Sequence, residues 1–421
     1  MIYLDHAATT PLRKEVMEAM LPFFEENFGN PNSVHQIGQK ARASVDQARV
    51  TIANILHRSP HEIIFTSGGT ESNNLAIKGI LQSFTSGHVI VSAIEHPSVN
   101  ESLSCFCHKK EKTNSHSNLS EISPNMDPRL RGDDRKGGES KREKENDRGR
   151  ENLEGKLELT YINPEKNGII DPKKIKDAIR EDTRLICFMY ANNEIGTIQA
   201  ITKIGRIAEK AEIPFHCDAV QAGSLDLDIN KLKVTSLSLS GHKIYGPKGI
   251  GMLYVKKGLK LIPQIEGGGQ EHRRRSGTEN VASIVGFAKA LELIQQEREK
   301  KGNQMRELRD FFIDSILSKI PDCFLNGEKE NRLSNNINIL FKNVSAESLL
   351  LRLDMAGICV STGSACSSGS LEASDTLFHI GLTKEESMSS LRFSLGRMNT
   401  KKEIDEVIQL LKKIISDLRS I

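Results

Sequence analysis

The sequence predicts an α/β protein: a larger domain built on a mixed, mostly parallel sheet, and a smaller α+β domain. From about residue 40, helical patterns alternate with short apolar runs, which is the order that successive βα units produce. Polar residues follow most of these runs directly, at the strand ends where open α/β sheets bind ligands. After Gly267–Gly269 the alternation gives way to a long charged amphipathic helix, which indicates a second unit.

Short apolar runs give the expected strands of the large sheet. They are rich in β-branched and aromatic residues, and turn residues or charges bound them. The last run is expected to lie antiparallel beside the one before it. The expected strands are residues 62–66, 88–92, 157–161, 184–190, 213–217, 237–239 and 251–255.

Two domains can be formed by a chain of 421 residues. We expect residues 13–260 to form the large domain, and residues 1–12 together with 261–421 to form the small one. The elements expected in the second half are a helix over Val281–Lys319, strands near 336–341 and 357–360, and a final helix from Lys401.

A charged segment interrupts the large domain. Between Arg129 and Glu151, sixteen of twenty-three residues are charged and only Leu130 is apolar. Such a stretch cannot bury enough apolar surface to offset the entropy cost of ordering it. We therefore expect residues 109–155 to be a disordered surface insertion. A basic tether for RNA is the alternative, which the mixed signs, nine basic against seven acidic residues, disfavour.

Composition argues against several classes of protein. The net charge of +3 is small for this length, so neither nucleic acid nor an anionic membrane is indicated as a direct partner. Seven cysteines, an odd number without C-x-x-C spacing, argue against a disulfide framework and a structural zinc site. No apolar run approaches transmembrane length and Met1–His6 shows no basic leader, so we expect a cytoplasmic protein.

Lys243 is the residue with the clearest chemical implication. Leu237 and Leu239 alternate with serines, and the turn over Gly246–Gly251 is rich in glycine, so Lys243 follows a short strand. Partial desolvation there lowers the pKa of an ammonium group, and a neutral lysine can form a Schiff base with pyridoxal phosphate. Taken alone, the motif favours a surface lysine in a polar turn by about two to one, since single motifs mislead often.

Other strand ends carry residues that suit the same cofactor. Gly69 and Thr70 open a helix, whose amino end can hold a phosphate. His96 can stack on a flat ring and move protons. Asp218 can lie against a pyridinium nitrogen and keep it protonated.

Short motifs along the whole chain carry a family resemblance. They are YLDHAATT at 3–10, GNPNS at 29–33, SGGTE at 67–71, EH at 95–96, NNEIG at 192–196, DAVQ at 218–221, SGHK at 240–243, RSGT at 275–278 and GSACSSGSLE at 363–372. With these motifs the chain resembles the fold-type I pyridoxal-phosphate enzymes of aminotransferase class V. Among those enzymes it is similar to the group I cysteine desulfurases of the NifS/IscS type. The resemblance spans Tyr3 to the final helix and excludes only the insertion.

The resemblance implies a role for each matching residue. Lys243 would hold the cofactor and move the substrate α-proton, His96 would stack on the ring as acid or base, and Asp218 would pair with the ring nitrogen. Arg392, assisted by Asn30, would bind the substrate carboxylate in a planar, two-bond contact. The other implied contacts are Asn193 and Gln221 with the phenolic oxygen, Gly69, Thr70, Ser240 and His242 with the phosphate, and Thr278 from the second subunit of a homodimer.

Cys366 would be the nucleophile. Glycines and serines surround it and cannot anchor a core, so we expect a mobile loop. The implied reaction converts L-cysteine to L-alanine, leaving a persulfide on Cys366 that passes to an acceptor or iron–sulfur scaffold protein, for cluster assembly or tRNA thiolation. No intrinsic metal site is expected; a transient contact of Cys366 with an iron–sulfur cluster is the only metal interaction implied.

Other functions fit the same residues. A selenocysteine lyase or another class V lyase would share the cofactor site, and the length of the Cys366 loop favours the desulfurase. A catalytically silent paralogue could keep the fold as an interaction module in a sulfur-transfer complex. Alanine release from L-cysteine by the purified protein distinguishes the enzyme from the catalytically silent paralogue.

Overall fold

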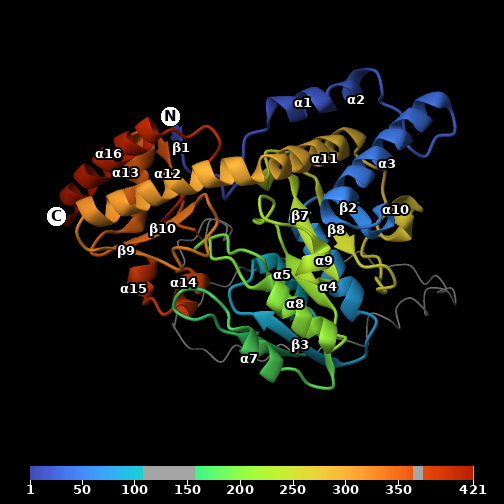
Figure 1. Ribbon diagram of the computed structural model, residues 1–421, viewed down its shortest axis with the longest axis horizontal. Coiled ribbons are helices and arrows are strands. Elements are labelled where there is room, and N and C mark those ends of the chain that lie inside the picture. Colours follow the sequence, from blue (N-terminus) through green and yellow to red (C-terminus); the bar gives the residue numbers. More distant parts are fainter. Residues whose placement is uncertain (108–156, 364–372, 421) are drawn as a thin grey trace, which may run out of the picture.

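The computed structural model describes residues 1–107, 157–363 and 373–420. The insertion expected at 109–155 and the nucleophile Cys366 both lie outside these ranges. Figure 1 shows a larger unit around the main sheet and a smaller unit beside it that contains both chain termini. None of the described helices has the length and apolar character that a membrane span requires.

A seven-stranded sheet in the described part of the chain forms the centre of the larger unit, in the order β2-β8-β7-β6-β5-β3-β4. From β7 to β4 all pairs are parallel, whereas β8 is antiparallel to both of its neighbours. The expected mostly parallel sheet is confirmed, as is the antiparallel strand at 251–255. The strands are β2 (Ile63–Thr66), β3 (Gly87–Ser92), β4 (Leu157–Ile162), β5 (Thr183–Met189), β6 (Phe215–Asp218), β7 (Ser236–Ser240) and β8 (Gly251–Val255).

Helices cover both faces of this sheet. Alternate residues of β5 belong to different cores, because successive side chains of a strand point to opposite faces: Ile186 packs in one core, and Leu185 and Cys187 in the other. Helices α3, α8 and α11 contribute to the first core, and α4 and α5 to the second. The helical segments of this unit before α11 are α1 (Lys14–Met20), α2 (Pro22–Glu25), α3 (Gln36–Leu56), η1 (Pro60–Glu62), α4 (Gly69–Leu81), α5 (Pro97–Ser104), α7 (Pro172–Asp177), α8 (Ile201–Lys210), α9 (Ile229–Leu232), η2 (Gly241–Lys243) and α10 (Gln270–Arg273).

The smaller unit packs helices against an antiparallel sheet in the order β12-β10-β9. The amino terminus joins it, because β1 (Ile2–Tyr3) pairs with β11 (Ile358–Cys359) and Leu4 is buried in its core. Its remaining elements are α12 (Arg298–Lys319), β9 (Cys323–Leu325), β10 (Asn336–Phe341), α13 (Ala346–Met355), α14 (Asp375–His379), α15 (Lys384–Ser387), β12 (Ser390–Ser394) and α16 (Lys401–Arg419).

The division between the two units differs from the expected one. Although the pattern places 261–421 in the small domain, Phe287 and Leu291 of α11 (Val281–Gln296) are buried in the core of the larger sheet. The single helix expected over 281–319 is two helices, because the backbone at Glu297 (φ −90°, ψ −3°) departs from helical geometry. We propose that the small domain consists of residues 1–12 and 297–421.

A buried ion pair connects α3 with the segment that follows Gly267–Gly269. The Arg49 guanidinium donates to both carboxylate oxygens of Glu271 at 2.8 Å, and both side chains are almost fully buried. The carboxylate also accepts the amide of Phe65 on β2 at 3.0 Å. A buried charge depends on its partner, since removing one member leaves the other unpaired in a low-dielectric surrounding.

We expect Glu271→Gln to lower the free energy of unfolding by about 3 kcal/mol, because the Arg49 charge stays buried without its counter-ion. Urea unfolding followed by circular dichroism measures the change. The matched control is Glu18→Gln in the exposed pair with Lys14, where the charges are 3.7 Å apart and about 0.5 kcal/mol or less is expected. Equal losses of unfolding free energy in the two variants would show that the buried Arg49–Glu271 pair contributes no more to stability than an exposed pair.

Candidate active site

Most of the predicted cofactor and substrate residues line one cavity of about 520 Å³ at the carboxyl edge of the large sheet. They come from different parts of the sequence because parallel strands end at the same edge. The segment Ala7–Ala8 and the residue Gly363, both of the smaller unit, also line the cavity. The predicted site residues that line it are His96, Lys243, Gly69, Thr70, Asn193, Asp218, Gln221, Ser240, His242 and Arg392.

The turn from β2 into α4 forms the anion-binding end of the cavity. Helix α4 begins at Gly69, so the first amides of its amino end have no partner within the helix and carry the positive end of its dipole. A Cβ at Gly69 would lie 2.6 Å from Val220 Cγ2, so the close approach of the two segments requires glycine. Ser240 and His242 line the same cavity, from β7 and from the turn that follows it.

Asp218, at the end of β6, is a buried carboxylate held by uncharged donors. Its Oδ1 accepts the amide of Val220 at 2.9 Å, and its Oδ2 accepts from Asn73 Nδ2 at 2.8 Å. Only 7% of the residue is exposed, and none of the ion pairs found among the described residues involves it. Burying a carboxylate is costly without a cation, so this group suits a positively charged partner inside the cavity.

Asn73 links Asp218 to two histidines, a connection that the sequence does not predict. Besides Asp218, its Nδ2 donates to Ser98 Oγ at 2.9 Å, and its Oδ1 lies 3.0 Å from His216 Nε2. Burial lowers the pKa of His216 to about 3, so this ring is neutral and donates through Nε2 to Asn73. Asn73 therefore donates both amide hydrogens, to Asp218 and to Ser98, and its carbonyl oxygen accepts from His216.

His96 precedes α5 as its N-cap residue, and Pro97 occupies the first position of the helix. The amide of Ser98 donates to His96 Nδ1 at 3.1 Å, and the Ser98 hydroxyl lies 2.8 Å from the same nitrogen. Since Nδ1 accepts, the proton of the neutral ring is on Nε2. The ring is thereby fixed in one tautomer on the cavity wall.

A second carboxyl group lies below the cavity. Glu95, 7% exposed, accepts the amide of Met189 at 2.6 Å through Oε1. Burial, and next the negative charge of Asp218, raise the pKa of Glu95 well above its usual value. A negative charge on Asp218 therefore disfavours a negative charge on Glu95.

Lys243 ends the single 3₁₀ turn η2 that follows β7. Its Nζ donates to the carbonyls of Ala7 and Ala8, the latter at 2.8 Å, and Gln221 Nε2 donates to Ala7 O at 3.0 Å. The amino-terminal segment thus closes one side of the cavity over the lysine. Burial, and next the charge of Lys243, lower the pKa of His242 to about 4, so His242 is neutral at physiological pH.

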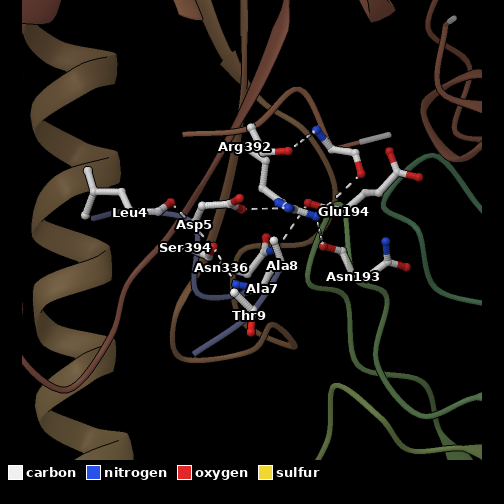
Figure 2. Close-up of polar contacts among 12 residues, drawn as sticks. Leu4, Asp5, Ala7, Ala8, Thr9, Asn193, Glu194, Asn336, Arg392 and Ser394 are labelled. Atoms are coloured by element: carbon white, nitrogen blue, oxygen red, sulfur yellow. Dashed lines mark hydrogen bonds and ion pairs between the residues drawn. The ribbon is translucent and has the colours of Figure 1, made fainter. Parts of the chain in front are cut away.

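Arg392, in the middle of β12, brings a cation from the smaller unit into the cavity (Figure 2). Its Nη1 donates to the carbonyl of Asn193 at 2.9 Å, and its Nη2 donates to Asp5 Oδ1 at 2.8 Å. The residue is 2% exposed, and its Nε finds no partner among the described residues. An unpaired buried donor is costly, so this guanidinium suits an anionic ligand.

Three predicted site residues are not placed in the cavity. Asn30 is exposed, and its Oδ1 accepts the amide of Asn32 at 2.9 Å, so the chain does not bring it to Arg392. Thr278 is exposed and does not line the cavity of its own chain. Cys366 lies outside the described residues, and Gly363, the last described residue before it, lines the cavity.

Sequence reasoning missed other residues of the site. Asn73 and Ser98 follow the predicted motifs by a few residues, and Asp5 lies within the YLDHAATT motif. The helical period of 3.6 residues could have indicated Asn73, because it lies one turn after Gly69 and therefore on the same face of α4. No group of three His, Cys, Asp or Glu side chains in the described ranges is arranged to hold a metal ion.

A sequence model of the aminotransferase class-V family matches residues 2–114 and 151–407. The chain belongs to this family. The match omits 115–150, within the charged insertion. Enzymes of aminotransferase class V use pyridoxal phosphate, and the anion-binding turn, the buried Asp218 and Lys243 fit its phosphate, ring nitrogen and aldehyde in turn.

Similar proteins span the full length of this class-V chain. The cysteine desulfurase IscS of Dictyoglomus turgidum is 45% identical over 100% of this chain and 96% of its own length, and that of Methanosarcina thermophila is 44% identical over 100% and 93%. A NifS-like protein from Rickettsia africae has a similar structure, with a TM-score of 0.78, 30% identity and 99% of both chains covered. The structure of SspA in complex with cysteine matches with a TM-score of 0.72 and 33% identity, over 94% of this chain and 99% of SspA.

The buried His216 makes the stability of the protein depend on pH. Its pKa is about 3 in the folded state and 6.5 when unperturbed, so between these values the unfolded chain binds a proton that the folded chain does not. The stability present above pH 6.5 is therefore lost as the pH falls.

We expect His216→Gln to reduce the loss of stability between pH 7 and pH 5 by about 2 kcal/mol, since glutamine does not titrate. Urea unfolding of both proteins at the two pH values gives the difference. Any constant effect of the substitution cancels in this comparison. Equal pH dependence in the wild type and the variant would show that His216 is not the titrating group.

Proposed function

We propose that this protein is a pyridoxal-phosphate cysteine desulfurase in which Lys243, His96 and Cys366 carry the chemistry. The desulfurase activity follows from full-length similarity to cysteine desulfurases at identities of 38–45%. The roles of the residues are supported by one observation above all. Lys243, Asp218 and Arg392, which supply an amine, an anion and a cation, line a single cavity.

Pyridoxal phosphate, when bound, supplies an electron sink for the negative charge that develops at the substrate α-carbon. Lys243 provides the amine for its aldehyde, and Asp218 the carboxylate for its ring nitrogen. Asp218 is suited to this because its two present partners, Asn73 and Val220, are uncharged donors. The remaining proposed contacts are Asn193 and Gln221 at the phenolic oxygen, and Gly69, Thr70, Ser240, His242 and the second subunit's Thr278 at the phosphate.

Two residues move protons in this proposal. Lys243 takes the α-proton of the substrate, which needs a neutral amine and a cavity closed to bulk water. Ala7 and Ala8 cover the lysine through their carbonyls and help to close the cavity. His96 stacks on the cofactor ring and donates through Nε2, because Ser98 occupies Nδ1.

Arg392 binds the substrate carboxylate. Asn193 O and Asp5 Oδ1 already fix the plane of the guanidinium, so little side-chain freedom is lost when the substrate binds. The unpartnered Nε gives a donor for a carboxylate oxygen. Asn30, exposed in this chain, would assist only from the partner subunit of a dimer.

Cys366 takes the substrate sulfur in a step that needs no outside oxidant. A bond forms between the Cys366 thiolate and the substrate sulfur. The Cβ–S bond of the substrate breaks, its electron pair stays on Cβ, and Cβ takes up a proton. The products are L-alanine and a persulfide on Cys366. The persulfide sulfur then passes to an acceptor or scaffold protein, for iron–sulfur cluster assembly or tRNA thiolation.

A homodimer is part of the proposal. Phe24, Phe28 and Val34 are 64%, 68% and 89% exposed, an unusual density of large apolar side chains on a protein surface. Asn30, a predicted substrate contact, lies in the same stretch of chain. A second copy covering this segment would bury the apolar side chains and bring a polar residue to its partner.

We expect purified protein with pyridoxal phosphate to release alanine from L-cysteine, and Cys366→Ser to reduce this release at least a hundredfold while leaving the cofactor bound. Alanine is measured by chromatography and bound cofactor by its visible absorption. The loss follows from replacing a thiolate with a far weaker nucleophile.

Lys243→Ala distinguishes the cofactor role from the sulfur role. Borohydride reduction should fix the cofactor to the Lys243 peptide of the wild type and of Cys366→Ser, and to no peptide of Lys243→Ala. Transfer of ³⁵S from labelled L-cysteine to candidate acceptors then identifies the acceptor. Wild-type transfer by Cys366→Ser would refute the persulfide role, and a wild-type protein without alanine release would refute the function.

We expect Phe28→Glu to shift the protein from dimer toward monomer, because a charge replaces an apolar contact at the proposed interface. Sedimentation velocity measures the shift, and Phe324→Glu, on the 49% exposed side chain of β9, is the control. A dimer unchanged in Phe28→Glu would place the interface elsewhere.

A further inference from the structure

The turn between β5 and α8 connects the larger unit with the smaller one. Asn192 Oδ1 accepts the amides of Glu194 at 2.8 Å and Ile195 at 2.9 Å, which fixes the turn from within. The Glu194 carbonyl accepts from Asn336 Nδ2 and Asn338 Nδ2 of β10, both at 3.2 Å. Backbone and side-chain contacts thus hold this turn against the smaller unit at a fixed place.

The Glu194 side chain reaches both ends of the segment 364–372. On the far side, Ser374 Oγ donates to Glu194 Oε2 at 2.6 Å, and Thr376 also hydrogen-bonds the carboxylate. On the near side, a Cβ built on Gly363 would lie 3.0 Å from the same oxygen. One carboxylate therefore lies beside the last described residue before the segment and accepts a hydrogen bond from a residue just after it.

The hydrogen bonds at Ser374 have a defined direction. Ser374 Oγ accepts the amide of Leu377 at 3.1 Å, so its single proton is available for Glu194. Burial raises the pKa of Glu194, while the hydrogen bonds from Ser374 and Thr376, and the charge of Arg392, oppose that rise. The carboxylate acts as an acceptor for hydroxyls from one side of the segment and packs against the backbone of the other.

The same turn also carries two groups of the active site. Asn193 lines the cavity and is proposed to contact the cofactor, and its carbonyl holds Arg392 at 2.9 Å. The Arg392 Nη1 also lies 3.5 Å from the Gly363 carbonyl. Figure 2 shows Asn193, Glu194 and Arg392 close together, with Asp5 on the other side of the guanidinium.

We propose that Glu194 is a positioning residue for sulfur transfer: its carboxylate holds Ser374, just after the segment that contains Cys366, and lies beside Gly363, just before it, relative to substrate bound by Arg392. This rests on the proposed role of Cys366 as nucleophile. Glu194 touches no reacting atom in the proposal. It acts on the step in which Cys366 takes the sulfur, and the earlier removal of the substrate α-proton by Lys243 does not depend on it.

Two reactions of one protein separate this role from a general one. Alanine release from L-cysteine requires Cys366, whereas exchange of the α-hydrogen of L-alanine in D₂O requires only the cofactor, Lys243 and Arg392. We expect Glu194→Ala to slow alanine release about tenfold or more, and to leave α-hydrogen exchange within about twofold of the wild type. Mass spectrometry measures both, and Cys366→Ser gives the baseline for release.

A third readout does not depend on the cofactor. Amide hydrogen exchange in the peptide covering 373–380 should be faster in Glu194→Ala, because the Ser374 hydroxyl that caps α14 loses its acceptor. Glu194→Gln keeps an oxygen acceptor and should restore part of the sulfur transfer. Ser374→Ala removes the donor to Glu194 and also the acceptor that caps α14. It should slow alanine release in the same direction as Glu194→Ala and provides the test if that variant does not fold.

The matched control is Glu165→Ala, which removes an exposed carboxylate paired with Lys174 at 2.6 Å and should change none of these readouts. Equal loss of alanine release and α-hydrogen exchange in Glu194→Ala would overturn the proposal, because Glu194 would then act on the cofactor or substrate. Unchanged release in both Glu194→Ala and Ser374→Ala would overturn it as well. Failure of the proposed function itself would appear separately, as sulfur transfer that survives in Cys366→Ser.

Discussion

The buried carboxylate of Asp218 is the constraint on which the rest of the active site depends. It lies at the end of β6 without a cation beside it, and two neutral donors hold it in place. A buried charge of this kind is stable only if its neighbours add no further negative charge and a cationic partner can approach. The neutral ring of His216 and the raised pKa of Glu95 both favour the first condition. The open cavity beside Asp218 meets the second.

Asn73 extends this constraint to the opposite wall of the cavity. By donating to both Asp218 and Ser98, it connects the proposed partner of the ring nitrogen with His96, which is proposed to stack on the ring. Ser98 then fixes the tautomer of His96. One amide thus positions Asp218 directly and His96 through Ser98.

The smaller unit contributes the cation Arg392 and the described residues on both sides of 364–372. Arg392 lies in the middle of β12, and the backbone pairing of β12 with β10 fixes its position. Its two neighbours, Asp5 and Asn193, belong to different units, so the guanidinium joins them at the cavity. Glu194 lies next to Asn193 in the sequence. A single turn therefore contacts Arg392 through Asn193 and lies beside residues on both sides of 364–372 through Glu194.

The sequence by itself determined the fold class, the strands of the large sheet and most of the cavity residues, because parallel strands end at one edge and chemistry-bearing residues follow them directly. It did not predict β12, the strand that contains Arg392. It could not determine that α11 packs with the larger unit, since an amphipathic helix fits either core equally well. Nor could it place Asn73, Asp5 and Glu194, whose partners lie 145, 387 and 180 residues away. Hydrogen bonds across such separations leave no periodic signal, and only the tertiary structure decides which polar residues meet.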